Sequence, residues 1–159
     1  MNLRLTISCI ALFAAGFAQS ALAGDGNDQG ANGQGANGTS YIATITDSNG
    51  NFASRGVITL HSDHTMSVID SAQGGPQFFF SSQLGAWHVG GNGVVTGRTI
   101  DFDFPNADIA RLDYTIHFGA NGSATGTITL TAFPLHANPL DGGGTVVGTF
   151  TFTAYSIAP

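Results

Sequence analysis

Apolar and polar residues alternate with a period of two from Thr39 to the end of the chain. This alternation is typical of β-strands that face a core on one side and solvent on the other. Clusters of Gly, Asn, Asp, Ser and Pro separate the alternating runs, as turns require. No run has the 3.6-residue period of an amphipathic helix. The predicted strands are 39–46, 54–61, 65–70, 77–82, 85–89, 94–104, 110–118, 123–133 and 145–155, of which the fourth and fifth are either one bent strand or two.

The connections between these runs are short, which predicts antiparallel hairpins in sequence order. Asn-Gly occurs at 49–50, 92–93 and 121–122, and this dipeptide tolerates the positive φ of hairpin turns. A series of eight or nine hairpin strands either splits into a sandwich or closes into an up-and-down barrel. Closure removes the exposed edges, which suits a chain with no Lys to protect them. We therefore predict an all-β fold for 39–159, an up-and-down antiparallel barrel of about eight strands in meander order.

The first 23 residues have the pattern of a signal peptide. Arg4 precedes an apolar run from Leu5 to Phe17, and Ala21-Leu22-Ala23 is a small-x-small cleavage site. The alternative, an anchored N-terminal helix, is disfavoured because the apolar run is short for a membrane span. The prediction is a secreted or periplasmic protein without stable membrane insertion after cleavage. The single cysteine, Cys9, leaves with the signal, so thiol catalysis and Cys-based zinc sites are excluded.

Residues 24–38 are rich in Gly and Asn and contain few apolar side chains. We interpret them as a flexible tether, none of which is buried. A calcium-binding Gly/Asp repeat is the alternative, but it needs several stacked copies and more acidic residues than Asp25 and Asp28.

The composition of the chain excludes further classes of function. All 4 basic residues are Arg, all 10 acidic residues are Asp, and the net charge is −6. Nucleic-acid binding is excluded, because neutralisation of phosphates supplies most of the affinity in such complexes. No Ser-His-Asp spacing stands out. His61, Asp63 and His64 surround one turn and could chelate a metal, but polar turn residues are the favoured interpretation. We predict no metal site and no cofactor.

The dry face of each strand is expected to point into the lumen of the barrel. On strand 94–104 this assigns Ile100, Phe102 and Phe104 to the interior. On the last two strands the threonines take the outer face. The candidate ligand-binding residues are aromatic side chains assigned to the lumen, namely Phe80, Trp87, Phe102, Tyr114, Phe150 and Phe152.

Four charged residues are expected on the outer face. If the turn after strand 94–104 centres on Ala107, Asp103 lies opposite Arg111 and Asp101 lies opposite Asp113. We predict an exposed ladder in which Arg111 offsets the repulsion between the acids. The alternative is a working carboxylate pair that shares a proton or holds a hard cation.

Three glycines bear on whether the lumen is hollow. Gly97, Gly126 and Gly148 lie in three different strands and remove side-chain volume from the wall. They either only coil the strands or also leave an apolar pocket, the usual form of a small-molecule site. Eight strands allow both outcomes, because their interior is filled by side chains or holds one small ligand.

The order of hairpins, with Phe80-Ser81-Ser82, Gly85-Ala86-Trp87, Ile100-Asp101-Phe102 and the loop Asn138-Pro139-Leu140-Asp141, resembles small secreted bacterial barrels. The types in question are lipocalin-like (calycin) and allene oxide cyclase-like. The likeness covers about Thr39 to Pro159. It implies a cup for one hydrophobic molecule and assigns no catalytic residue.

Three functions follow from this sequence. The first is an exported barrel that binds a small apolar molecule. The second is an enzyme of the cyclase or isomerase kind, which needs a polar group with a shifted pKa aimed into the lumen. Tyr114 is the only titratable candidate on the predicted lumen face, so binding is favoured over catalysis. The third is a solid-cored structural or interaction domain.

Overall fold

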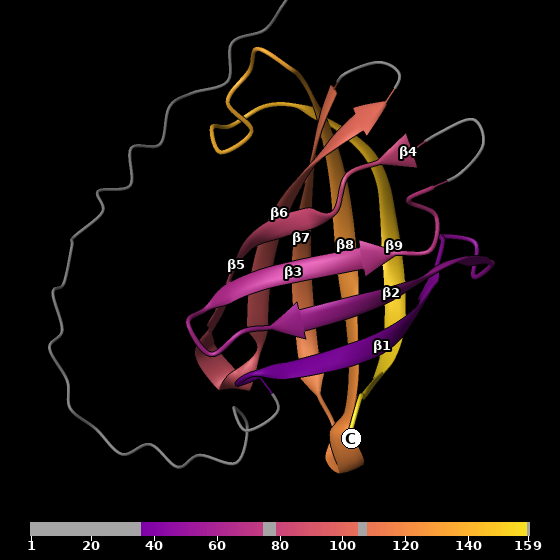
Figure 1. Cartoon of the computed structure of the whole chain (residues 1–159), viewed down its shortest axis with the longest axis vertical. Coiled ribbons are helices and arrows are strands. Elements are labelled where there is room, and N and C mark those ends of the chain that lie inside the picture. Colours follow the sequence, from indigo (N-terminus) through magenta and orange to yellow (C-terminus); the bar gives the residue numbers. More distant parts are fainter. Residues whose placement is uncertain (1–35, 75–78, 105–107, 159) are drawn as a thin grey trace, which may run out of the picture.

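The computed structural model describes residues 36–74, 79–104 and 108–158, and its strands form a closed antiparallel barrel (Figure 1). Short 3₁₀ turns, η1 (Gly91–Gly93) and η2 (Ala120–Gly122), occupy two of the connections. The strands are β1 (Thr39–Thr46), β2 (Phe52–Leu60), β3 (Thr65–Asp70), β4 (Phe79–Phe80), β5 (Gln83–Val89), β6 (Val95–Phe104), β7 (Asp108–Phe118), β8 (Ser123–Pro134) and β9 (Thr145–Ser156).

Eight strands make the barrel, each paired with its neighbour in the chain. β3 pairs with β5, β6 with β7, and β9 returns to pair with β1, which closes the ring. β4 is a two-residue strand that pairs with the end of β6. The region with two predicted alternatives, 77–89, is therefore two strands. The predicted all-β, up-and-down barrel is confirmed, and in Figure 1 β1–β3 cross in front of β7–β9 at a steep angle.

Two of the three Asn-Gly turns have positive φ at both residues, and at the third only Gly50 does. Asn92 and Asn121 have φ of 61° and 56°, and the glycines that follow them also have positive φ. These are the angles that hairpin turns with a right-handed strand twist demand. The turns set the register of β5 against β6 and of β7 against β8.

The register between β6 and β7 differs from the prediction and reverses the faces of β6. Asp103 pairs with Asp108 and Asp101 with Ala110, three residues away from the expected alignment. An odd shift moves every side chain of a strand to the other face. Asp101 is therefore inside the barrel and 3% exposed, whereas Phe102 is outside and 46% exposed.

Two predictions fail for this reason. Ile100, Phe102 and Phe104 do not face the lumen, and Phe104 stacks on Phe79 of β4 on the outside, with ring centroids 5.3 Å apart. The exposed ladder is also wrong, because Asp101 is buried in the interior. The faces of β7, β8 and β9 agree with the prediction, and Leu112, Tyr114, Ile128, Phe152 and Ala154 are all buried.

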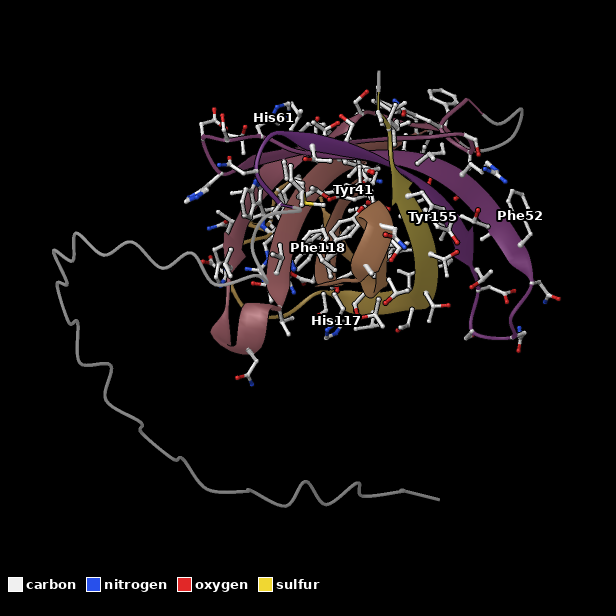
Figure 2. All side chains as sticks on the ribbon, turned by 90° about the horizontal axis from the view of Figure 1, so that it is seen from below. Tyr41, Phe52, His61, His117, Phe118 and Tyr155 are labelled. Carbon is white, nitrogen blue, oxygen red and sulfur yellow. The ribbon has the colours of Figure 1, made fainter. Side chains whose placement is uncertain are left out.

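Buried side chains fill the lumen at the end near the C terminus, which is the lower end in Figure 1. We call this region the packed half. Trp87 is buried there, and its indole Nε1 donates to the backbone oxygen of His61 at 3.0 Å. Tyr41 and Phe118 contact each other at the end itself, with ring centroids 5.6 Å apart, and Figure 2 shows both inside the ring of strands. The packed half consists of Tyr41, Leu60, Met66, Trp87, Val95, Ile116, Phe118, Ala124, Phe152 and Ala154.

Two of the three glycines serve this packing. A Cβ at Gly97 would lie 2.6 Å from the sulfur of Met66, and one at Gly126 would lie 2.6 Å from the ring of Phe152. The volume that these glycines vacate is therefore occupied by neighbouring side chains. Gly97 and Gly126 therefore do not hollow out the lumen, and the open pockets that they help to line include outward-facing residues such as Thr96 and Thr125.

The loop between β8 and β9 folds over the outside of the barrel near the upper end in Figure 1. The Arg111 guanidinium on β7 donates from Nη1 to the backbone oxygen of Pro139 at 2.8 Å and lies 5.0 Å from the centre of the Phe133 ring. Ile109 and Phe133 are buried under this cover although they point away from the lumen. We call residues 135–144 the outer loop.

The N-terminal segments are described only from Ala36 onward. Ala36 is 1% exposed and belongs to the core, so the expectation that none of 24–38 is buried is wrong at this residue. The predicted signal peptide, 1–23, and residues 24–35 lie outside the described part of the chain. In the part that is described, no helix combines the length and the apolar character needed to cross a membrane.

Candidate functional site

A cavity of about 240 Å³ occupies the other half of the lumen. We call this region the cavity half. It opens at the end where β4 and the outer loop lie, and its lining runs from exposed alanines at the rim to fully buried side chains. The residues that line it are Ile45, Ala53, Ser54, Asp70, Ala72, Phe80, Gln83, Asp101, Asp103, Ala110, Leu112, Tyr114, Ile128, Leu130 and Phe150.

The wall of the cavity is mostly aliphatic and aromatic. Leu112 on β7, Ile128 and Leu130 on β8 and Phe150 on β9 are consecutive inward positions of neighbouring strands. Such a surface favours a hydrocarbon group, because its transfer from water is favourable by about 25 cal/mol for each Å² buried. The carboxyl and amide groups of the lining lie on β3, β5 and β6, and the hydroxyl groups of Ser54 on β2 and Tyr114 on β7 border them.

A buried hydrogen-bond network forms the boundary between the cavity and the packed half. The Tyr114 hydroxyl donates to Gln83 Oε1 at 2.5 Å, and the Thr99 hydroxyl donates to the same oxygen at 3.1 Å. Burial raises the pKa of Tyr114, so its hydroxyl stays protonated at neutral pH. These bonds fix the Tyr114 ring on one side of the cavity.

Asp70, at the end of β3, has partners for both carboxylate oxygens. Ser54 Oγ donates to Oδ2 and the backbone N–H of Ala72 donates to Oδ1, each at 2.8 Å. Both oxygens of Asp70 therefore have hydrogen-bond donors within the protein.

Asp101 differs, because its Oδ1 is buried without a hydrogen-bond partner. Burial, with a smaller effect from the nearby Asp103, raises the pKa of Asp101 to about 7. Burial and the neighbouring Asp108 also raise the pKa of Asp103. An unpaired buried carboxylate oxygen costs free energy. A carboxyl group near half-ionisation in an apolar cavity is suited to proton transfer or to pairing with a donor.

No basic side chain offsets these acids among the described residues that line the cavity. Across the described part of the chain, no group of three or more His, Cys, Asp and Glu side chains is arranged to hold a metal ion. His61 and His64 are engaged elsewhere, since His61 bonds to Ser67 at 3.1 Å and His64 packs edge-on against Trp87.

The six predicted ligand-binding residues fall into three groups. Phe80, Tyr114 and Phe150 line the cavity. Trp87 and Phe152 point inward but are buried in the packed half. Phe102 lies on the outer surface. The ligand-binding role of these residues stays a prediction.

The polar side of the cavity was not predicted from the sequence, because Asp101 was assigned to the outer face and Gln83 was not singled out. Both lie on inward positions, and both were hidden by the wrong face or by an uncertain strand boundary. One signal was present, since proline favours the first central position of a β-turn. A two-residue turn beginning at Pro105 would set Asp103 against Asp108, which is the pairing observed.

No protein-family model, curated protein or solved structure matches the chain. The functional assignment therefore rests on the geometry of the cavity.

Proposed function

We propose that this protein is an exported β-barrel that binds a small hydrophobic molecule in its lumen, in the manner of lipocalin-like barrels. The observation that carries the proposal is the 240 Å³ cavity with an aliphatic and aromatic wall. An apolar cavity of about 150 Å³ in another protein is known to accept benzene, so this cavity suits an alkylbenzene or a molecule of similar size. The filled packed half gives the cavity a closed floor.

Binding of an uncharged alkylbenzene tests this proposal. Propylbenzene should raise the melting temperature of the full chain, because a ligand that binds only the folded state stabilises it by mass action. It should also shift the methyl NMR signals of Leu112 and Ile128, which line the cavity, while the signal of Ile116 in the packed half stays in place.

Ala110→Leu provides the matched variant, because Ala110 lines the cavity and the larger side chain fills part of it. The variant should fold and bind propylbenzene more weakly. If propylbenzene changes neither the melting temperature nor the methyl signals of the wild type, the binding proposal fails.

A second candidate function is proton-transfer catalysis of the isomerase kind. It is favoured by Asp101, whose raised pKa of about 7 suits a general acid or base. In such a reaction the ionised carboxyl would take a proton from the carbon beside a carbonyl and return it to the same or another carbon. Deuterium uptake at that carbon of cyclohexanone in heavy water, faster with wild type than with Asp101→Asn, would favour this function. Equal uptake would exclude it for this probe.

A further inference from the structure

The buried carboxylate oxygen of Asp101 indicates which chemical group a ligand of the cavity would carry. Asp101 is 3% exposed and lines the cavity, and its Oδ1 accepts no hydrogen bond. Nearly all buried polar atoms in folded proteins have a partner. A molecule that brings a hydrogen-bond donor to this oxygen would satisfy it and favour its ionised form.

The charges around Asp101 specify the kind of donor. Asp70 and Asp103 line the same cavity, and the described lining has no Arg or His. Asp70 already accepts bonds from Ser54 and Ala72, whereas Asp101 presents a fully buried oxygen without a partner in the described structure. Three carboxyl groups in a cavity of low dielectric favour a positive charge, and a cationic donor makes stronger hydrogen bonds than a neutral one.

The opposite wall restricts the rest of the molecule. Leu112, Ile128, Leu130 and Phe150 face the polar side across the cavity, and a hydrated inorganic ion would leave this apolar surface exposed to water. A hydrocarbon body attached to the cationic group covers it.

Resting on the proposed binding function, we infer that the cavity selects small apolar amines. The protonated nitrogen donates to Asp101, and the hydrocarbon part fills the space between Leu112, Ile128 and Phe150. In this arrangement Asp101 determines the chemical class of the ligand. The residues of the apolar wall limit its size.

Two probes of nearly equal shape separate charge from hydrocarbon contact. Phenethylamine carries an ammonium group at neutral pH, and propylbenzene carries a methyl group in its place. Calorimetric titration of both into the full chain at pH 7.5 should show phenethylamine binding about 10- to 100-fold more tightly, the effect expected for a hydrogen bond to a charged group.

Two variants locate the origin of this preference. Asp101→Asn keeps the side-chain shape and removes the charge, and it should abolish the preference for phenethylamine over propylbenzene. Asp141→Asn removes the same charge at an exposed position of the outer loop, and it should leave the preference intact. A preference that survives Asp101→Asn would overturn the inference, because the amine would then be held elsewhere.

The pH dependence of wild type gives a second readout that does not require the variant to fold. An alkylamine stays protonated between pH 5 and 8, whereas Asp101 ionises over this range. Asp70, Asp103 and Tyr114 are the other titratable groups that face the cavity among the described residues. The affinity for phenethylamine should rise from pH 5 to 8 relative to that for propylbenzene, and a constant ratio would contradict the inference.

The outcomes distinguish this inference from the proposed function. Propylbenzene binding as tightly as phenethylamine would overturn the amine selectivity and leave the binding function standing. Failure of both probes to bind would overturn the binding function, and the inference with it.

Discussion

Phe150 and Phe152 lie two residues apart on β9 and point into the same lumen, but their surroundings differ. Phe152 is 3% exposed and its ring occupies the space that Gly126 leaves open on β8. Phe150 is partly buried and lines the cavity. Alternation along a strand therefore decides that a side chain points inward, but its neighbours on other strands, such as Gly126 beside Phe152, decide whether it meets a side chain or a space.

The outside of the barrel shows the reverse arrangement. Around the packed half, the outward-facing residues His117, Thr125, Thr153 and Tyr155 are exposed to solvent. Around the cavity half, Ile109 and Phe133 are buried beneath the outer loop and Arg111. On β7 and β8 the wall of the cavity half is therefore covered on its outer face, whereas Phe102 on β6 and Val146 on β9 remain exposed.

The largest expected effect is on stability, from the pair of phenylalanines. Phe152→Ala should lower the free energy of unfolding by about 3–5 kcal/mol, because it removes a ring from a filled core and leaves a void. Phe150→Ala should lower it by clearly less, since the ring already borders a cavity. Urea unfolding of both variants measures the difference. Equal losses would show that the two halves are packed alike.

A matched pair of alanines tests the opposite change. Ala124→Leu in the packed half should lower the free energy of unfolding by about 1–3 kcal/mol, because no space receives the added atoms. Ala110→Leu, on the cavity wall, should cost less or stabilise the fold. Thermal unfolding monitored by circular dichroism compares them, and an equal or larger loss in Ala110→Leu would contradict the presence of usable space.

The next effect depends on pH and concerns the Asp101 carboxyl group in the cavity half. Its folded pKa of about 7 lies above the ordinary value of 3.8, so between these values the folded state holds the proton more tightly than the unfolded chain. This contribution to stability is complete below about pH 4 and is lost as pH rises through 7.

The size of this pH effect on stability follows from the shift in the pKa of Asp101. Between pH 5 and 8 wild type should lose on the order of 2 kcal/mol relative to Asp101→Asn, whose amide does not titrate. Asp103 acts in the same direction in both proteins, so the difference isolates Asp101. Chemical unfolding of both proteins at several pH values measures it. A difference that does not vary with pH would place Asp101 in contact with water.

The sequence predicted the barrel because each level of information agreed. The period of two, the Asn-Gly turns and the absence of helical runs all indicate a meander of hairpins, and eight such strands close readily. The faces of β7, β8 and β9 followed from the same alternation. The interior of the packed half could be predicted from the sequence because its residues are apolar.

The cavity could not be predicted from the sequence, because its polar side contradicts the assumption that the apolar face of a strand is the buried one. On β6, Thr99 and Asp101 face inward while Phe102 faces out. The deciding information is the register against β7, and an error of three residues there reversed the whole strand. Functional sites are the places where such rules of patterning are expected to fail.

The smallest expected effect concerns the contact between the outer loop and the cavity half. It compares two arginines that both form an ion pair with Asp113. Arg98 and Arg111 both donate to Asp113, at 2.5 and 3.0 Å. Arg111 is 15% exposed and also bonds to Pro139 in the outer loop, whereas Arg98 is 48% exposed and has no outer-loop bond among the described residues.

Arg111→Ala should therefore cost about 1–2 kcal/mol, contrary to the small loss expected for an exposed ladder, because it leaves a backbone oxygen and the Phe133 ring uncovered. Arg98→Ala should cost at most about 1 kcal/mol, as exposed ion pairs do. Arg111→Ala should also speed hydrogen exchange at the amides of β7 and β8 in the cavity half, while the amides of the packed half keep their protection. Equal losses of unfolding free energy in the two variants, with hydrogen exchange unchanged, would mean that the outer loop does not stabilise the wall of the cavity.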